Sequence, residues 1–310
     1  MSGESTNKYQ EAGLESRIPF YLRARPYFIL APALIITIGI MYPFFLAVYY
    51  SMTNFSFRLP SYKFIGLKNY ITMFSSVDFW HSLWVTVLYG FVTTASELAL
   101  GTVVAMLLSK SDNPFTRVLK VSLIFPLMIP PVIATLVWQL MTNKAVGILE
   151  KMFRIINIYN FPWASSPRTA LFTVALIDIW VYTPFMMILV LAGIQSLPKS
   201  PFEAARIDGG GAFFTFRALT LPLLAPYMLI AVIFRLMAAF QEFTIIYALT
   251  KGGPGDTLMN LSITAYLKGF TFQKLGAALP YILVLWIIVF FVSQKLVKRW
   301  LTMRKFASGD

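Results

Sequence analysis

Residues 196–222 read SLPKSPFEAARIDGGGAFFTFRALTLP, a loop rich in charged residues and glycine that separates two long apolar blocks. Ser200 is a good N-cap, and Glu203 follows it at the spacing of a capping box. Gly209–Gly211 would then end the helix after roughly two turns. A second short helix through 213–217 would lead into the next apolar block. The pattern predicts a stiff helix–turn–helix between two apolar segments.

The apolar blocks outside this loop are long enough to cross a membrane. The chain is 58% hydrophobic and only 13% charged, with a mean hydropathy of +0.70, so it lacks the charged surface of a soluble domain. Crossing about 30 Å of hydrocarbon takes roughly 20 helical residues. We therefore expect an all-α integral membrane protein with transmembrane helices at Tyr27–Tyr50, Leu83–Leu108, Val118–Met141, Ala170–Ile194, Leu221–Leu249 and Ala277–Trp300.

An even number of spans places both termini on one side of the membrane. Lys and Arg are more frequent in the segments that would share that side, namely 1–26, 109–120, 195–220 and 295–310. This bias predicts cytoplasmic termini and a cytoplasmic loop at 195–220. We expect a cytoplasmic tail at 1–26, a six-span domain at 27–300 and a cytoplasmic tail at 301–310. Residues 145–158 have apolar positions at helical spacing, which predicts an interfacial helix on the outer face.

Composition also argues against several classes of function. The net charge of +13 is spread over loops and tails without a basic cluster among stacking aromatics. This favours contact with membrane lipid over nucleic acid. The chain has no cysteine, and the single histidine, His81, has no neighbouring ligand set for a metal. It has no G-x-x-x-x-G-K-[ST], H-E-x-x-H or G-x-S-x-G motif. We expect no enzyme activity, no metal and no cofactor.

The loop resembles a known family signature at specific positions. Glu203-Ala204-Ala205, Gly209 six residues after Glu203, and Leu219-x-Leu221-Pro222 resemble the EAA loop of binding-protein-dependent ABC permeases. Leu219 stands where isoleucine is more common. The resemblance implies a type I importer permease whose 195–220 loop is a coupling helix, moved as a rigid body by a separate ATPase. The residues of this ATPase-coupling loop would be Glu203, Ala204, Ala205, Asp208, Gly209 and Pro222.

Two further segments resemble carbohydrate permeases of the maltose type (UgpA-like). Phe64–Tyr70 resembles their GL-x-NY element, and Leu249–Gly255 resembles their T-x-GGPG element. The resemblance implies sugar uptake across a bacterial inner membrane by alternating access. The implied partners are a second homologous permease, two ATP-binding cassette subunits and an extracytoplasmic solute-binding protein. A permease for another solute, a self-sufficient channel or secondary transporter, and, as a weaker class, a membrane enzyme remain alternatives.

Glu203 has two compatible explanations. A capping-box glutamate contributes about 1 kcal/mol to a marginal helix, which is reason enough for its presence. The same carboxylate could also face a cation on the ATPase.

Ionisable residues inside the spans mark candidate substrate contacts. Each costs at least about 2.5–3.5 kcal/mol at mid-depth, so such residues normally face a bundle interior or a cavity. Glu97 and Asp178 are better explained as links between helices. For Arg235, Gln241 and Glu242, a role in linking helices and a role in binding substrate have about equal support. Sugars bind to planar polar groups and aromatic faces, which these spans offer. The full set of candidates for the substrate pathway is Trp180, Tyr182, Arg235, Gln241 and Glu242.

Overall fold

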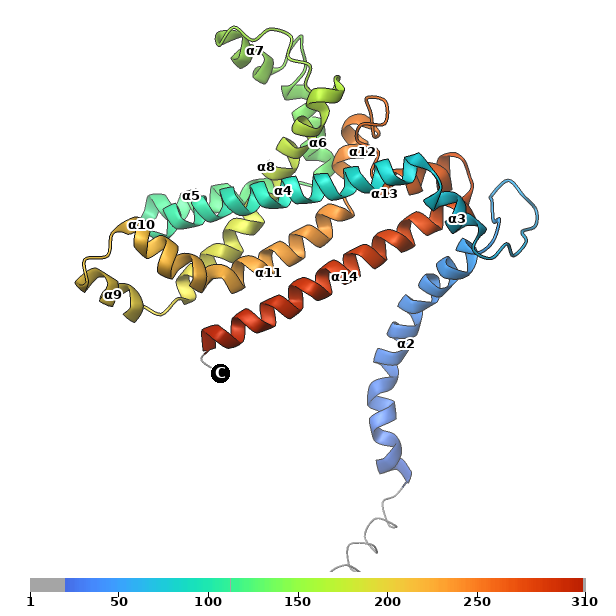
Figure 1. Cartoon of the computed structure of the whole chain (residues 1–310), viewed down its shortest axis with the longest axis horizontal. Helices are drawn as coiled ribbons and strands as arrows, with labels where there is room; N and C mark the ends of the chain where they lie inside the picture. Colours follow the sequence, from blue (N-terminus) through green and yellow to red (C-terminus); the bar gives the residue numbers. More distant parts are fainter. Residues whose placement is uncertain (1–19, 112, 309–310) are drawn as a thin grey trace, which may run out of the picture.

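The computed structural model describes residues 20–111 and 113–308, and Figure 1 shows an elongated bundle of helices. Within these ranges the only extended pairing is one isolated antiparallel bridge between Thr53 and Phe64. Most of the predicted tail at 1–26 lies outside the described residues. The helices at both ends are longer than expected, because α2 begins at Phe20 and α14 continues to Ser308. The all-α fold expected from the sequence is confirmed.

Five helices of the described chain are long and apolar enough to cross a membrane. Four of them are α2 (Phe20–Ser51), α4 (Val77–Ser109), α8 (Pro167–Ser196) and α14 (Leu275–Ser308). The fifth is a continuous run of α10 (Ala212–Thr215), the π-helical η2 (Phe216–Thr220) and α11 (Leu221–Phe240). A sixth span is present if two bent segments are counted as one. These segments are α5 (Pro114–Ile124) with η1 (Phe125–Met128), and α6 (Pro131–Met141).

The third predicted span is not one straight helix. Its two arms, 114–128 and 131–141, meet at an angle of 98°. Pro130 and Pro131 sit at the corner, and proline lacks the amide hydrogen and clashes with the preceding turn of a helix. The predicted span Val118–Met141 is therefore divided into two helices at this corner.

The fifth predicted span, Leu221–Leu249, is also interrupted. Helix α11 ends at Phe240, and a separate helix α12 (Thr244–Thr250) follows. A further helix, α13 (Leu261–Tyr266), continues as the π-helical η3 (Leu267–Thr271), where the sequence suggested only an outer loop. The membrane part of the chain therefore contains more short helices than the sequence suggested.

The core of the bundle is formed by α4, α8 and α11, which approach one another closely at glycines. A Cβ at Gly101 of α4 would lie 2.7 Å from the Cβ of Met186 on α8. A Cβ at Gly193 of α8 would lie 2.8 Å from the Cβ of Tyr227 on α11. Small residues allow such close packing of membrane helices, so these glycines fix how the three helices meet.

The remaining short helices lie at the ends of the bundle (Figure 1). Helix α9 (Ser200–Ile207) lies at the end where α14 also ends, and α3 (Lys68–Phe74) lies at the opposite end. Helix α7 (Ile148–Ile155), the amphipathic segment expected from the sequence, stands away from the bundle. The apolar part of α2 buries no residue against the rest of the chain.

Candidate functional site

The loop at 195–220 folds as predicted, except at its start. Helix α9 begins at Ser200 itself, with Lys199 in the N-cap position and no capping side chain. The predicted capping box is therefore wrong: Ser200 already has helical geometry, so Glu203 no longer lies three residues after the cap. The first amides of α9 are satisfied by the Lys199 carbonyl, which accepts from the amides of Phe202 and Glu203 at 3.0 and 3.1 Å.

The end of α9 is a well-defined glycine stop. Gly209 has a φ of +75°, the left-handed conformation that favours glycine. The amide of Gly210 donates to the carbonyl of Ala205 at 2.8 Å, and that of Gly209 donates to the carbonyl of Arg206 at 3.2 Å. These two bonds form a Schellman motif. The turn fixes the direction in which the chain leaves α9.

The outer surface of this loop is exposed and partly apolar. Glu203, Ala204 and Asp208 are exposed, whereas Ala205 is buried. Ile207 is 86% exposed and Phe213 is 73% exposed. Large apolar side chains grouped with charges on a protein surface are typical of docking sites. Pro222, the last signature residue, lies at the start of α11, directly after the π-helical η2.

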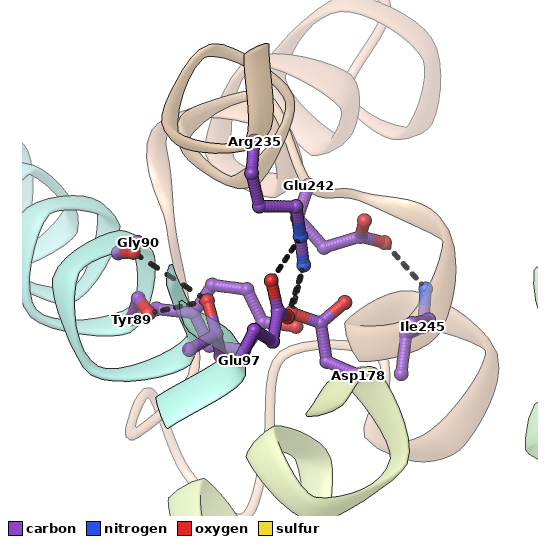
Figure 2. A network of polar contacts seen from close by, with 8 residues as sticks. Tyr89, Gly90, Glu97, Asp178, Arg235, Glu242 and Ile245 are labelled. Atoms are coloured by element: carbon purple, nitrogen blue, oxygen red, sulfur yellow. Dashed lines mark hydrogen bonds and ion pairs between the residues drawn. The ribbon is translucent and has the colours of Figure 1, made fainter. Parts of the chain in front are cut away.

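A buried ion network joins the three central helices. Arg235 on α11 donates from Nε to Oε2 of Glu97 at 2.6 Å and from Nη2 to Oε1 at 2.9 Å. The same Nη2 donates to Oδ2 of Asp178 on α8 (Figure 2). All three side chains are buried. The prediction that Glu97 and Asp178 link neighbouring helices is confirmed, and Arg235 is their shared partner.

Tyr182 completes the surroundings of this arginine. The guanidinium carbon of Arg235 lies 4.2 Å from the centre of the Tyr182 ring, a distance at which the ring face attracts a cation. Glu242 lies nearby but bonds elsewhere (Figure 2). None of the ion pairs recorded for the described residues joins Arg235 to Glu242.

The break between α11 and α12 is held by side chains from α13. Oε1 of Glu242 accepts from the amide of Ile245 at 2.8 Å. The backbone carbonyl of Glu242 accepts from the Asn260 side chain, which also caps α13. Ser262 Oγ donates to the carbonyl of Gln241 at 3.4 Å. The carbonyls freed at the end of α11 are therefore satisfied inside the protein, as a membrane environment requires.

The candidate pathway residues do not form one cluster. Arg235 and Glu242 are buried and Tyr182 is half-buried, whereas Gln241 is exposed at the break. Trp180 packs against Trp138, with ring centroids 6.0 Å apart. It lies two residues from Tyr182 along α8 and so points to another side of that helix.

A groove next to the break adds residues that the sequence did not single out. It has a volume of about 510 Å³, and its lining includes Gln241, Phe243, Ser262, Tyr266, Phe270 and Trp286. The volume falls in the range of small-molecule sites, and a few polar groups among aromatic rings are typical of them. In the sequence, the only signal for these residues is the aromatic content of 261–272.

Comparison with known proteins agrees with this architecture. Residues 97–302 match the family described as binding-protein-dependent transport system inner membrane component. A trehalose/maltose transport system permease protein, MalF, from Thermococcus litoralis is 35% identical over 269 residues, which cover 87% of this chain and 86% of that protein. A sulfoquinovosyl glycerol transport system permease protein, SmoG, from Agrobacterium fabrum is 34% identical and covers 80% of this chain and 81% of that protein.

The fold is shared with solved transporters. A chain of the crystal structure of a bacterial ABC transporter involved in import of the acidic polysaccharide alginate superposes with a TM-score of 0.77 at 18% identity. The superposition covers 90% of this chain and 96% of that chain. At this identity the likeness shows the fold. Together, the matched segment, the full-length relatives and the shared fold show that the chain belongs to the family of inner-membrane components of binding-protein-dependent transport systems.

Proposed function

We propose that this chain is a permease subunit of an ABC importer that carries a sugar across a bacterial cytoplasmic membrane. Two relatives that share most of their length with it are named for transport of trehalose and maltose and of sulfoquinovosyl glycerol. Both names describe carbohydrate derivatives, which supports a sugar as the substrate of this chain. The observation that carries the proposal is the similarity to these permeases over 80–87% of this chain.

The α9 loop would couple the permease to a separate ATPase. It is a short helix with a fixed turn, exposed carboxylates, and apolar side chains such as Ile207 and Phe213. Because α10, η2 and α11 form one continuous helix from Ala212 to Phe240, a push on α9 would pass through the turn at Gly209–Gly211 into the central bundle. ATP hydrolysis would take place on the partner subunits, and both termini and α9 would lie in the cytoplasm.

The substrate would pass between this chain and a second permease. The exposed Gln241 and the buried Glu242 lie where α11 is broken, and broken membrane helices often form substrate sites. Tyr182 and Arg235 would stand behind them, and Trp180 would lie apart on α8. A solute-binding protein would deliver the sugar from the outside, and ATP-driven closure below would switch the side on which the pathway opens.

Uptake by the complete reconstituted importer tests this proposal. Proteoliposomes would contain this chain, its second permease and the two ATPases, with the solute-binding protein outside and ATP inside. We expect radiolabelled maltose, trehalose or another sugar of a glycoside panel to accumulate with ATP and not with a non-hydrolysable analogue. Accumulation of amino acids but of none of the sugars would contradict the sugar assignment. Flux without any ATPase would indicate a self-sufficient channel or carrier.

A further inference from the structure

A continuous series of aromatic side chains leads from the end of α2 to the break after α11. We call this series the aromatic row, and it consists of Tyr49, Tyr50, Phe55, Phe57, Tyr62, Phe270, Tyr266, Tyr247 and Phe243. Every ring in it has another ring of the row within 6.5 Å, measured between centroids. The row is formed by two segments that lie about 200 residues apart in the sequence.

One contact closes the gap between these segments. Phe57, in the loop after α2, stacks on Phe270 of η3 with centroids 6.5 Å apart and ring planes within 28°. Beyond Phe270, Tyr266 lies 5.4 Å away, and the Tyr247 and Phe243 rings each lie 5.1 Å from Tyr266. The loop is anchored just after η3, because Ser56 Oγ and the backbone amide of Phe57 both donate to the carbonyl of Gln273, at 2.7 and 3.0 Å. The stacked arrangement is therefore held by backbone contacts.

The row runs from one end of the molecule toward its middle. The end of α2 lies opposite α9 in the long direction of the chain (Figure 1). At the inner end of the row, Phe243, Tyr266 and Phe270 line the groove that also holds Gln241 and Ser262. Its outer part is accessible, since Phe57 is 55% exposed and Phe270 is 61% exposed. A solute that entered beside α2 would meet the exposed rings of Phe57 and Phe270 before it reached the polar break.

We propose that the aromatic row is a binding track for sugar rings, which leads a carbohydrate to the groove at Gln241. The faces of these rings carry partial negative charge and attract the polarised C–H groups of a sugar. The tyrosine hydroxyls, the Gln241 amide and the Ser262 hydroxyl supply hydrogen bonds at its edges. If these rings only faced lipid, they would not need to contact one another, to line the groove or to end at the Gln241 amide. The inference rests on the proposed function, since it assigns the sugar a route through this chain.

Substitutions that remove a ring but keep apolar volume test the track. Phe57→Leu and Phe270→Leu are compared with Phe64→Leu, whose parent side chain is 64% exposed in the same loop as Phe57 but lies outside the row. Phe270→Trp keeps a ring at the inner position. The readout is uptake of radiolabelled maltose and trehalose by the complete importer in proteoliposomes. Co-purification with the second permease and the ATPases checks assembly of each variant.

We expect Phe57→Leu and Phe270→Leu to lower kcat/KM for uptake by about three- to tenfold each, mainly through a higher KM. Phe64→Leu should transport like the unaltered protein, whereas Phe270→Trp, which keeps a ring, should lose less of kcat/KM than Phe270→Leu. The tryptophan in Phe270→Trp should also change its fluorescence when sugar is added to the solubilised importer.

Two results would overturn the track. Leucine variants with unaltered KM would show that the rings only face lipid, and leucine variants that fail to assemble would show that they pack against the second permease. Failure of the proposed function looks different, since the unaltered importer would then accumulate no sugar at all.

Discussion

Arg235 on α11 bonds to both α4 and α8 because its guanidinium can donate hydrogen bonds in more than one direction. Its two bonds to Glu97 are parallel, and the same Nη2 reaches Asp178. Planar, two-pronged pairing of this kind is specific to arginine, so lysine could not replace it. The network therefore fixes the rotation of α11 about its own axis relative to α4 and α8.

Replacing Arg235 by methionine should strongly destabilise the protein. The change leaves Glu97 and Asp178 buried without their cation, and breaking one side of a buried ion pair costs about 3–5 kcal/mol. We expect a large fall in Tm, measured by size-exclusion chromatography of heated, detergent-solubilised protein. Adding Glu97→Gln and Asp178→Asn to Arg235→Met should restore most of the loss. Equal stability of Arg235→Met and the unaltered protein would show that the network is dispensable.

The sequence predicts part of this network and not the rest. Burial of Glu97 and Asp178 follows from the cost of a charge in hydrocarbon, and the structure confirms it. Their shared partner could not be predicted, because Arg235 lies 138 residues after Glu97 and 57 after Asp178. Such pairing depends on how each helix is rotated in the bundle. Arg235 and Glu242 are seven residues apart, about two helical turns, and this spacing argues against a direct pair.

At the scale of helices, close packing at Gly101 sets the distance between α4 and α8. A Cβ at this position would lie 2.7 Å from the Cβ of Met186 and 2.9 Å from the backbone nitrogen of Met187. Gly101→Ala should therefore lower the stability by about 1–3 kcal/mol, because a packed backbone cannot move aside cheaply. Gly39→Ala on α2 is the matched control, since no atom lies within 4 Å of its added Cβ. A Tm for Gly101→Ala equal to that of the control would argue against tight packing of the two helices.

The two helix breaks differ in how clearly the local sequence predicts them. The 98° corner between α5 and α6 coincides with Pro130 and Pro131, and proline disfavours helical geometry in the residue before it, so the sequence indicates this break. The break after Phe240 has no such signal, since Gln241-Glu242-Phe243 contains neither proline nor glycine. It is stabilised by Asn260 and Ser262, which follow about 20 residues later. Local patterns cannot report a break that depends on distant side chains.

Helix α9 allows the charge of Glu203 to be tested apart from its role in the helix. Because no capping box forms, Glu203→Gln removes the charge and leaves the helix start unchanged. If the carboxylate binds a cation of the ATPase, transport and sugar-stimulated ATP hydrolysis should fall by roughly tenfold. Unchanged rates of both in proteoliposomes would rule out a contact through the charge.

A second substitution in the same loop tests its shape. Gly209→Ala places a Cβ on a residue with φ of +75° and keeps every charge. The left-handed conformation costs a non-glycine residue about 1–2 kcal/mol, so the Schellman turn should open. We expect weaker co-purification of the ATPase with this variant. Full retention of the ATPase would mean that the turn does not orient α9.

At the scale of the whole molecule, the proposed importer requires a second permease beside this chain. Helix α2 buries none of its apolar window against the rest of the chain, and the groove beside α14 is open and largely apolar. A single chain with five or six spans leaves these surfaces without protein neighbours. A second permease of similar fold would cover them and enclose a pathway between the two subunits.

The orientation of this assembly in the membrane can be measured directly, because the chain has no cysteine. A single introduced cysteine is then the only thiol that a maleimide can label. Helix α9 lies at the end of the bundle where α14 ends, whereas α7 stands apart from it. We expect Asp208→Cys to be protected from a membrane-impermeant maleimide in intact cells and labelled once the cells are opened. Asn157→Cys, just after α7, should react in both conditions. The opposite pattern would place α9 outside, where no ATPase could reach it, and would overturn the coupling role together with the topology.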